Sequence, residues 1–169
     1  MKAIADSIIR NTATTLGISH VTDKPDKSDI TMPLPRIELT WLPEELKRSF
    51  RRISRLKQPN VPEVIIRSRV YQRTLRIRAE VVSDNEEWLE SFVPGFLAAL
   101  PGKTADENGN LVTVRAVKAE RQGYGTKMVE VFKRRTASIH IIVSGMVCDD
   151  QNIPLITDVN IVNGTNIGG

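Results

Sequence analysis

The sequence predicts an α+β fold: a mixed, mainly antiparallel sheet with helices packed on one face. Apolar residues recur at helical spacing in some segments and alternate with polar residues in others, so both kinds of element are expected. The chain has 169 residues, 40% hydrophobic and 26% charged, which suits one globular domain with its own core. We expect that single domain to cover residues 1–162, followed by a flexible tail at 163–169.

The first elements in the chain are a helix and a strand, separated by a long connection. Isoleucines recur at roughly helical spacing over residues 2–16, and Gly17 stands where a helix commonly ends. The next stretch is polar and punctuated by prolines, which predicts an irregular connection over residues 18–36. Apolar and polar residues then alternate over 36–41, which is typical of a short strand.

A second helix is predicted over residues 43–56, where the chain is richest in cations. Pro43 suits the first turn of a helix. Two glutamates follow it, at the end where the helix dipole favours negative charge. Pro59 would stop the helix. The apolar stripe that would face the core comprises Leu46, Phe50, Ile53 and Leu56.

The period of the apolar residues changes from helical to two at residue 64. Two alternating segments, 64–70 and 75–82, flank the polar "YQRT". This arrangement predicts a β-hairpin with one wet, cationic face. The face expected to be buried carries Leu75, Ile77, Ala79 and Val81.

A strongly apolar helix is expected over residues 83–100. Ser83 or Asp84 offers an N-cap, with a glutamate three residues further on as its partner. Pro94 and Gly95 predict a kink in this helix, or its division into two shorter ones.

The last third of the chain is expected to be mainly strands. Asn-Gly within "DENGN" (106–110) predicts a hairpin-type turn. A loop is expected at 118–127, and Cys148 to Asp150 are interpreted as the turn after a strand. The expected strands are 111–117, 128–132, 138–147 and 152–162.

No catalytic or metal-binding pattern is found in the sequence. Phosphate-cradling loops, H-E-x-x-H and paired C-x-x-C are absent, and His20 and His140 are isolated in the chain. The stretch 106–110 resembles the start of a calcium loop, but Val117 stands where a bidentate glutamate is needed. The sequence therefore predicts a protein that is not an enzyme, with no cofactor and no metal.

Compartment is indicated by two further observations. The single cysteine, Cys148, cannot form an internal disulfide and fits a reducing compartment. The N-terminal stretch lacks a sustained apolar segment, and no apolar run is long enough to cross a membrane. We expect a cytosolic protein with no membrane partner.

Positive charge is concentrated in one part of the chain. The net charge is +4, yet residues 34–78 contain twelve Lys or Arg and four Glu, so the remainder is net acidic. Such asymmetry predicts an anionic partner, or an assembly in which one subunit's basic surface meets a neighbour's acidic surface. The candidate interface residues are Arg48, Arg51, Arg52, Arg55, Arg76 and Arg78.

Three environments are open for these arginines: carboxylates of another protein or subunit, solvent alone, or nucleic acid. In a helix, Lys47 and Arg51 would form one of three like-charge i,i+4 pairs, each costing about 0.2–0.5 kcal/mol. An acidic partner explains them more easily than solvent does. No recognition-helix motif favours DNA. We therefore place protein carboxylates first and nucleic acid last.

The order of elements resembles a known family. An N-terminal helix and a basic segment lead into strands, an amphipathic "W-L" helix ending in "LP", and a strand led by "D-x-x-G-N-x-V-x-V". Over about residues 70–162 this is similar to the tail terminator (tail-completion) proteins of tailed bacteriophages. The matching residues are Trp88, Leu89, Leu100, Pro101, Asp106, Gly109, Asn110, Val112 and Val114.

The resemblance implies a structural virion protein without catalytic residues. It would form a homo-oligomeric ring, such as a hexamer. The ring would cap the tail tube and join it to the head-proximal connector. The protein would lie in the virion tail, and in the host bacterial cytoplasm during assembly. The long region before residue 70 keeps a baseplate or head–tail connector component open as an alternative. A nucleic-acid-binding protein using residues 47–78 is a further alternative.

Overall fold

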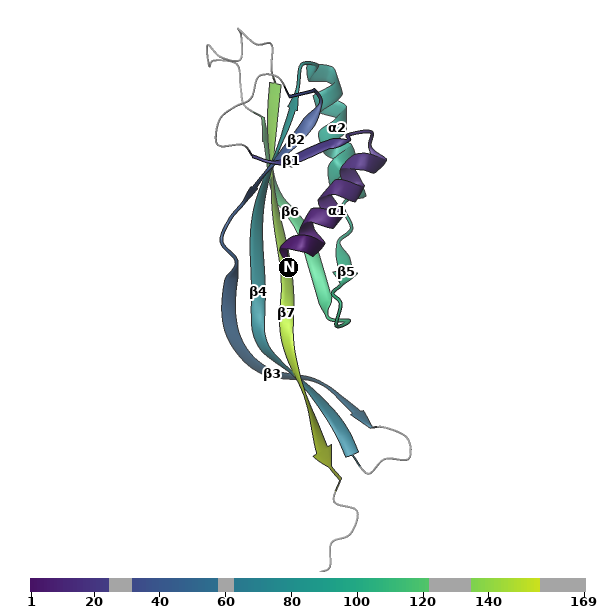
Figure 1. Cartoon of the computed structure of the whole chain (residues 1–169), viewed down its shortest axis with the longest axis vertical. Coiled ribbons are helices and arrows are strands. Elements are labelled where there is room, and N and C mark those ends of the chain that lie inside the picture. The colour runs from purple at the N-terminus through teal and green to yellow at the C-terminus, as the bar shows by residue number, and fades with distance from the viewer. Residues whose placement is uncertain (25–31, 58–62, 122–134, 156–169) are drawn as a thin grey trace, which may run out of the picture.

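The computed structural model describes residues 1–24, 32–57, 63–121 and 135–155. These residues form two helices and seven strands (Figure 1). In chain order the elements are α1 (Lys2–Thr15), β1 (His20–Asp23), β2 (Arg36–Trp41), β3 (Glu45–Lys57), β4 (Glu63–Ser83), α2 (Glu86–Ala99), β5 (Lys103–Ala105), β6 (Leu111–Arg121) and β7 (Arg135–Pro154).

The strands form one curled, mixed sheet. Its order is β1-β2-β4-β7-β6-β5, and β3 also pairs with β4. β1 and β2 are parallel, whereas all the other pairs are antiparallel. The predicted α+β class with a mixed, mainly antiparallel sheet is therefore confirmed.

The molecule has two parts, a body and an arm, and two long strands, β4 and β7, run through both. Residues 74–83 of β4 pair with β2 or lie beside it, whereas residues 64–74 pair with β3. β7 follows β4 along its whole length, but β6 accompanies β7 only as far as Ser144. The arm consists of β3, residues 63–74 of β4 and residues 144–154 of β7. It extends away from both helices (Figure 1).

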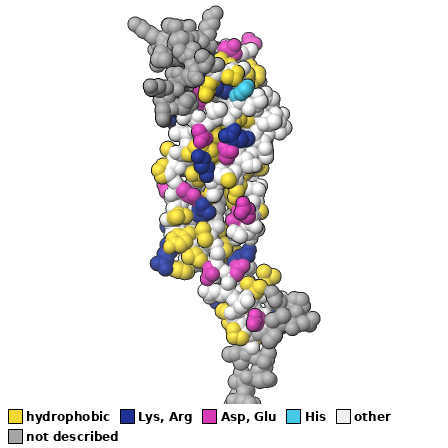
Figure 2. Space-filling model, in the orientation of Figure 1, with side chains coloured by type: hydrophobic (Ala, Val, Ile, Leu, Met, Phe, Trp, Pro, Cys, Tyr) yellow, Lys and Arg dark blue, Asp and Glu magenta, His cyan; other side chains and the backbone are white. Residues whose placement is uncertain are grey.

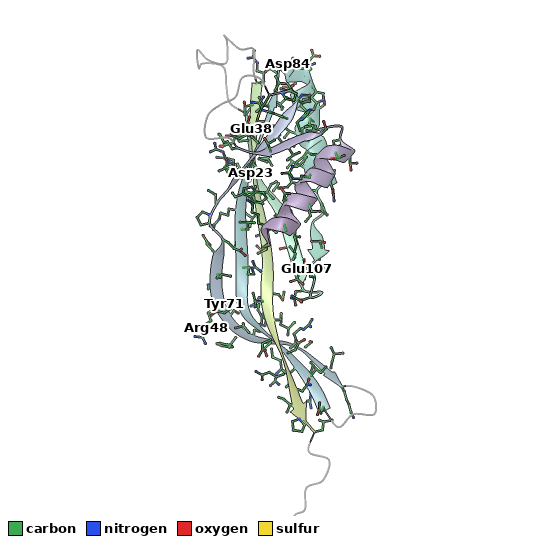
Figure 3. All side chains as sticks on the ribbon, viewed as in Figure 1. Asp23, Glu38, Arg48, Tyr71, Asp84 and Glu107 are labelled. Carbon is green, nitrogen blue, oxygen red and sulfur yellow. The ribbon has the colours of Figure 1, made fainter. Side chains whose placement is uncertain are left out.

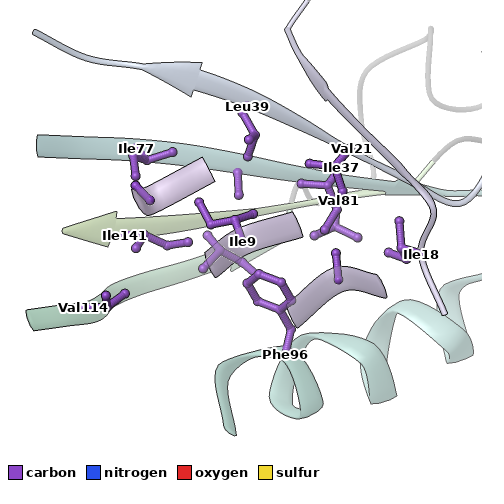
Figure 4. Packing of buried hydrophobic residues seen from close by; sticks show 14 of the residues in the cluster. Ile9, Ile18, Val21, Ile37, Leu39, Ile77, Val81, Phe96, Val114 and Ile141 are labelled. Carbon is purple, nitrogen blue, oxygen red and sulfur yellow. The ribbon is translucent and has the colours of Figure 1, made fainter. Parts of the chain in front are cut away.

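The core lies in the body and is built from alternate strand residues and the apolar sides of the helices. Phe96 of α2 and Ile9 of α1 are almost completely buried among them (Figure 4). Trp88, Phe92 and Phe96 form a row of ring contacts along α2. The strand residues predicted to be buried are at most 4% exposed: Leu75, Ile77, Ala79 and Val81.

The helix predicted at 2–16 is confirmed as α1, and its end has a clear cause. Gly17 adopts a φ of 85°, a left-handed conformation that costs glycine little. Its amide donates to the carbonyl of Thr14, and the amide of Ile18 donates to that of Ala13. This pair of bonds is the Schellman motif. It turns the chain so that buried Ile18 closes the end of the core.

The irregular connection predicted at 18–36 is wrong at its start. Residues 20–23 form β1, which pairs in parallel with β2. Val21, 5% exposed, joins the core, and Trp41 donates a hydrogen bond to Asp23 at 2.7 Å. The short strand predicted at 36–41 is confirmed as β2.

The helix predicted at 43–56 is also wrong, because this segment is strand β3. Two irregularities in its pairing with β4, one between Arg48 and Arg51 and one between Arg52 and Ser54, explain the error. Each bulge adds a residue and shifts the two-residue alternation by one. Two such shifts in thirteen residues give apolar spacings close to those of a helix.

The hairpin predicted over 64–82 is one continuous strand, β4, of 21 residues. The predicted turn "YQRT" lies inside it. A bulge is present next to that position, between Arg69 and Tyr71. The interruption of the alternation therefore came from an added residue rather than from a reversal of the chain.

The helix predicted at 83–100 is confirmed as a single helix, α2, that contains Pro94. Its N-cap is Asn85, not the predicted Ser83 or Asp84; the Asn85 side chain accepts a hydrogen bond from the amide of Trp88 at 3.0 Å. The predicted division into two helices is wrong.

The turn predicted at 106–110 is confirmed between β5 and β6. Asp106 accepts hydrogen bonds from the amides of Asn108 and Asn110, and Gly109 has a φ of 73°. The turn predicted at Cys148 to Asp150 is wrong, because β7 runs through it without a break to Pro154. The predicted strand 128–132, the end of 152–162 and the tail 163–169 lie outside the described residues.

Candidate assembly surface

The strand β3 exposes both its cations and its apolar residues. Every residue of β3 is exposed except Ser49 and Ser54, which are partly exposed. The four residues predicted as a core stripe are 46–70% exposed, with Phe50 the most exposed. Apolar and cationic side chains lie next to one another where β3 runs (Figure 2). A surface of this kind is unusual for an isolated subunit, because monomers rarely leave apolar residues gathered in one place.

The cations of β3 are not neutralised within the described chain. None of the six forms an ion pair with a described residue: Lys47, Arg48, Arg51, Arg52, Arg55 and Lys57. Arg48 instead lies over the ring of Phe50, 4.7 Å from its centroid, and points outward from the arm (Figure 3). Such a contact supplies only about 0.5–1 kcal/mol at an exposed site.

The six predicted interface arginines fall into two groups. Arg48, Arg51, Arg52 and Arg55 lie together on β3. Arg76 and Arg78 lie on β4 instead, and both are engaged: Arg76 pairs with Glu45, and Arg78 pairs with Glu80. The structure therefore brings four of the six arginines together on β3. The other two, Arg76 and Arg78, form ion pairs with carboxylates of the same chain.

A second open edge was not found from the sequence. Beyond Ser144, no strand of the described chain pairs with β7 on the side away from β4. This part of β7 exposes Val147 (39%) and Ile153 (42%), together with Asp149 and Asp150. Of the nine large apolar residues that are exposed within the described ranges, six lie on β3 or on this part of β7: Leu46, Phe50, Ile53, Leu56, Val147 and Ile153. The edge was missed because the sequence predicted a turn at 148–150, where β7 in fact continues.

A polar hollow of about 410 Å³ lies where the arm joins the body. Arg67 holds Asp150 through two hydrogen bonds of 2.7 Å. Hydrogen bonding by that guanidinium lowers the pKa of Asp150 below its usual range. Arg73 does the same for Glu44.

Two other groups that line the hollow, Asp106 and Cys148, are not activated for chemistry. Asp106 is held by the turn it caps. Burial raises the pKa of the Cys148 thiol, which keeps the thiol protonated at neutral pH and lowers its reactivity. Arg67 with Asp150 ties β4 to β7 within the arm, and Arg73 with Glu44 ties β4 to the residue before β3. No activated nucleophile is present among these residues.

The surface of the body contains a second ion-pair group, centred on Glu80. Only 5% of Glu80 is exposed, and its carboxylate accepts hydrogen bonds from Lys24 and Arg78. Burial alone would raise the pKa of Glu80, but these two cations outweigh it and the pKa lies below its usual range. His140 lies nearby on β7, with its Nε2 3.8 Å from Glu120.

Within residues 1–24, 32–57, 63–121 and 135–155, no three His, Cys, Asp or Glu side chains are grouped so as to hold a metal ion. Neither α1 nor α2, the helices of those ranges, has the length and apolar character needed to span a bilayer.

No protein-family model and no curated protein matches the chain.

Proposed function

We propose that the protein is a structural, non-catalytic subunit that assembles with copies of itself into a ring. The observation that carries the proposal is the arm, whose edge strand β3 exposes four large apolar residues and six cations without an ion pair in the described chain. A long edge strand with exposed apolar residues is a liability unless another chain covers it. Assembly removes that liability.

In this proposal the body and the arm have different tasks. Both helices pack on one face of the sheet and complete the core of each subunit. The opposite face is stabilised by ion pairs such as those of Glu80 with Lys24 and Arg78. The arm is then free to make contacts between subunits.

The uneven charge within the chain favours a ring over a dimer. A ring repeats one heterologous contact, in which two different surfaces of each subunit meet. Uneven charge within one chain suits such a contact, because a basic surface can meet an acidic surface of the next copy. Residues 34–78 are strongly basic and the remainder of the chain is net acidic.

The particular ring we propose is the tail terminator of a tailed bacteriophage. The support is the resemblance over about residues 70–162, within which the helix α2, the turn at 106–110 and the following strand are present in the expected order. The ring would cap the tail tube and join it to the head-proximal connector, in the virion and, during assembly, in the host cytoplasm. A baseplate or head–tail connector component is the alternative within the same class.

The test is the mass of the purified protein in solution, followed by its effect on tube assembly. We expect light scattering to give a defined multiple of 18.9 kDa, and electron microscopy to show rings. Added to polymerising tail-tube protein, the rings should limit tube length. A strict monomer at every concentration would contradict the proposal of assembly, and rings that leave tube length unchanged would contradict the terminator assignment.

A nucleic-acid-binding role is the second candidate, and the unneutralised cations of β3 favour it. Phosphate binding through several cations weakens steeply with salt. A gel-shift titration at about 50 mM salt, where that attraction is strong, separates the candidates. Tight binding of duplex or single-stranded DNA that is lost on replacing Arg51 and Arg55 with Gln would favour nucleic acid over a neighbouring subunit.

A further inference from the structure

The two open edges of the arm lie at the same level of the sheet. β3 pairs with residues 64–74 of β4, and residues 144–153 of β7 pair with the same residues from the other side. Each arm is thus a ribbon of three strands with β3 at one side and β7 at the other. Neither side is covered by a strand of the described chain.

We propose that the ring closes by strand pairing, with the free edge of β3 in one subunit pairing with the free edge of β7, residues 145–154, in the next. The arms then form one continuous sheet around the ring. This inference rests on the proposed self-assembly and specifies its contact.

Charge decides which edges meet. Pairing β3 with β3 of another copy would set six cations against six, and like charges opposite one another destabilise a sheet. Pairing β7 with β7 would oppose Asp149 and Asp150 to themselves and leave β3 exposed. Pairing β3 with β7 sets cations against carboxylates and covers the exposed apolar residues of both edges.

The direction of the strands follows from the topology. β3 and β7 both run antiparallel to β4, so they run parallel to each other. In a ring whose axis follows the arm, every β3 points the same way as every β7. The new pair is therefore parallel, and residues at the same level meet.

The register of β3 and β7 against β4 determines which residues would face each other across the contact. Arg52 and Asp149 both pair with Ser68, so they lie at one level and on one face. Asp150 is already held by Arg67, whereas Asp149 has no cation partner in the described chain. The contact across the ring is then Arg52 of one subunit with Asp149 of the next.

One level along, Arg51 and Cys148 both pair with Arg69. Within a subunit they are two strand spacings apart, or about 9–10 Å. A disulfide needs Cα atoms within about 7 Å, so a cysteine at position 51 could bond to Cys148 only in another subunit. Cys148 is the single cysteine of the chain, which makes it a clean reporter.

The crosslinking experiment uses the full-length Arg51→Cys variant under oxidation at alkaline pH, because burial raises the pKa of the Cys148 thiol and the thiolate is the reactive form. We expect a ladder of covalent species on a non-reducing gel, ending at the ring size, because each subunit joins two neighbours. The wild type, which has only Cys148, and Arg51→Cys with Cys148→Ser should both stay uncrosslinked. Covalent dimers in either control would indicate like-with-like pairing and overturn the proposal, as would an uncrosslinked Arg51→Cys variant.

The charge experiment uses Arg52→Glu and Asp149→Lys, singly and together. Each single variant should raise the concentration at which half the subunits are assembled by about tenfold or more. The double variant should return to near the wild-type value, because the ion pair is rebuilt with its signs exchanged. Circular dichroism and thermal unfolding confirm that each variant is folded.

Matched controls are Arg115→Glu on β6 and Glu87→Lys on α2, which reverse exposed charges away from both edges. They should leave assembly unchanged. Rings that form normally in both single variants would overturn the strand pairing and leave the proposed ring intact. A wild-type protein that is monomeric at every concentration would overturn both.

Discussion

The same substitution made at two phenylalanines tests most directly whether a neighbouring subunit covers β3. Phe50 on β3 is 70% exposed, whereas Phe96 on α2 is completely buried. Phe50→Thr removes a large apolar side chain and keeps a residue that suits a strand. We expect it to leave the fold almost unaffected and to weaken assembly.

The magnitude follows from the exposed area. A phenylalanine buries roughly 200 Å² when covered, so 70% exposure leaves about 140 Å² for a neighbour to cover. At about 25 cal/mol per Å² this is at most about 3.5 kcal/mol for each contact, or roughly 300-fold in the association constant. The cost to the isolated subunit is about 0.5–1 kcal/mol, from the lost contact with the Arg48 guanidinium.

The assay separates association from folding. Sedimentation equilibrium of Phe50→Thr should show subunits dissociating at concentrations where the wild type is assembled. Chemical denaturation should show a nearly unchanged free energy of unfolding for the subunit. Phe96→Thr is the control, because its core cavity should lower that free energy by about 3–5 kcal/mol. If Phe50→Thr unfolds as easily as Phe96→Thr, or assembles like the wild type, the reasoning is wrong.

The other predictions concern the body and are measured by chemical denaturation of the folded subunit. Glu80→Gln should lower the free energy of unfolding by about 1–3 kcal/mol at pH 7, because Lys24 and Arg78 lose a charged acceptor. Since the pKa of Glu80 is lowered by folding, its stabilisation is complete above its unfolded pKa of about 4.3 and is lost as the pH falls through the lower folded value. The difference between Glu80→Gln and the wild type should therefore shrink in acid; an equal difference at pH 7 and pH 3 would contradict this account. Asn85→Ala should cost about 1 kcal/mol through the lost N-cap of α2, whereas Asn85→Asp should cost little. Asp106→Ala should lower the free energy of unfolding by about 1–3 kcal/mol, because the backbone amides that donate to Asp106 in the β5–β6 turn lose their acceptor. A neutral effect would show that the turn does not depend on that carboxylate.

The sequence predicted the structure well where the residues of one element determine its conformation by themselves. α1 ends at Gly17 because a left-handed residue is needed there, and that requirement is visible in a single glycine. The buried face of β4 from Leu75 to Val81 follows from simple alternation. The turn at 106–110 follows from its Asn-Gly pair and the carboxylate of Asp106.

The arm could not be predicted because its chemistry is not local. β3 has the apolar spacing of a helix only because bulges shift a two-residue period, and bulges leave no mark in a single sequence. The continuous course of β4 and β7 through the arm depends on their pairing with each other over twenty positions. For the same reason four interface arginines were placed on the wrong kind of element, and the open edge of β7 was missed.

The shared strands have one more consequence, which concerns how a neighbour would find its place. Along a polar arm, one strand could slide past another by a residue at little cost. β4 and β7 cannot, because the same two strands continue into the body, where Ile77 opposite Ile141 must stay buried. A slip of one residue would turn the apolar face of the shifted strand toward water. The core therefore fixes the level of Asp149 on β7 relative to the arm residues of β4 before any second subunit arrives.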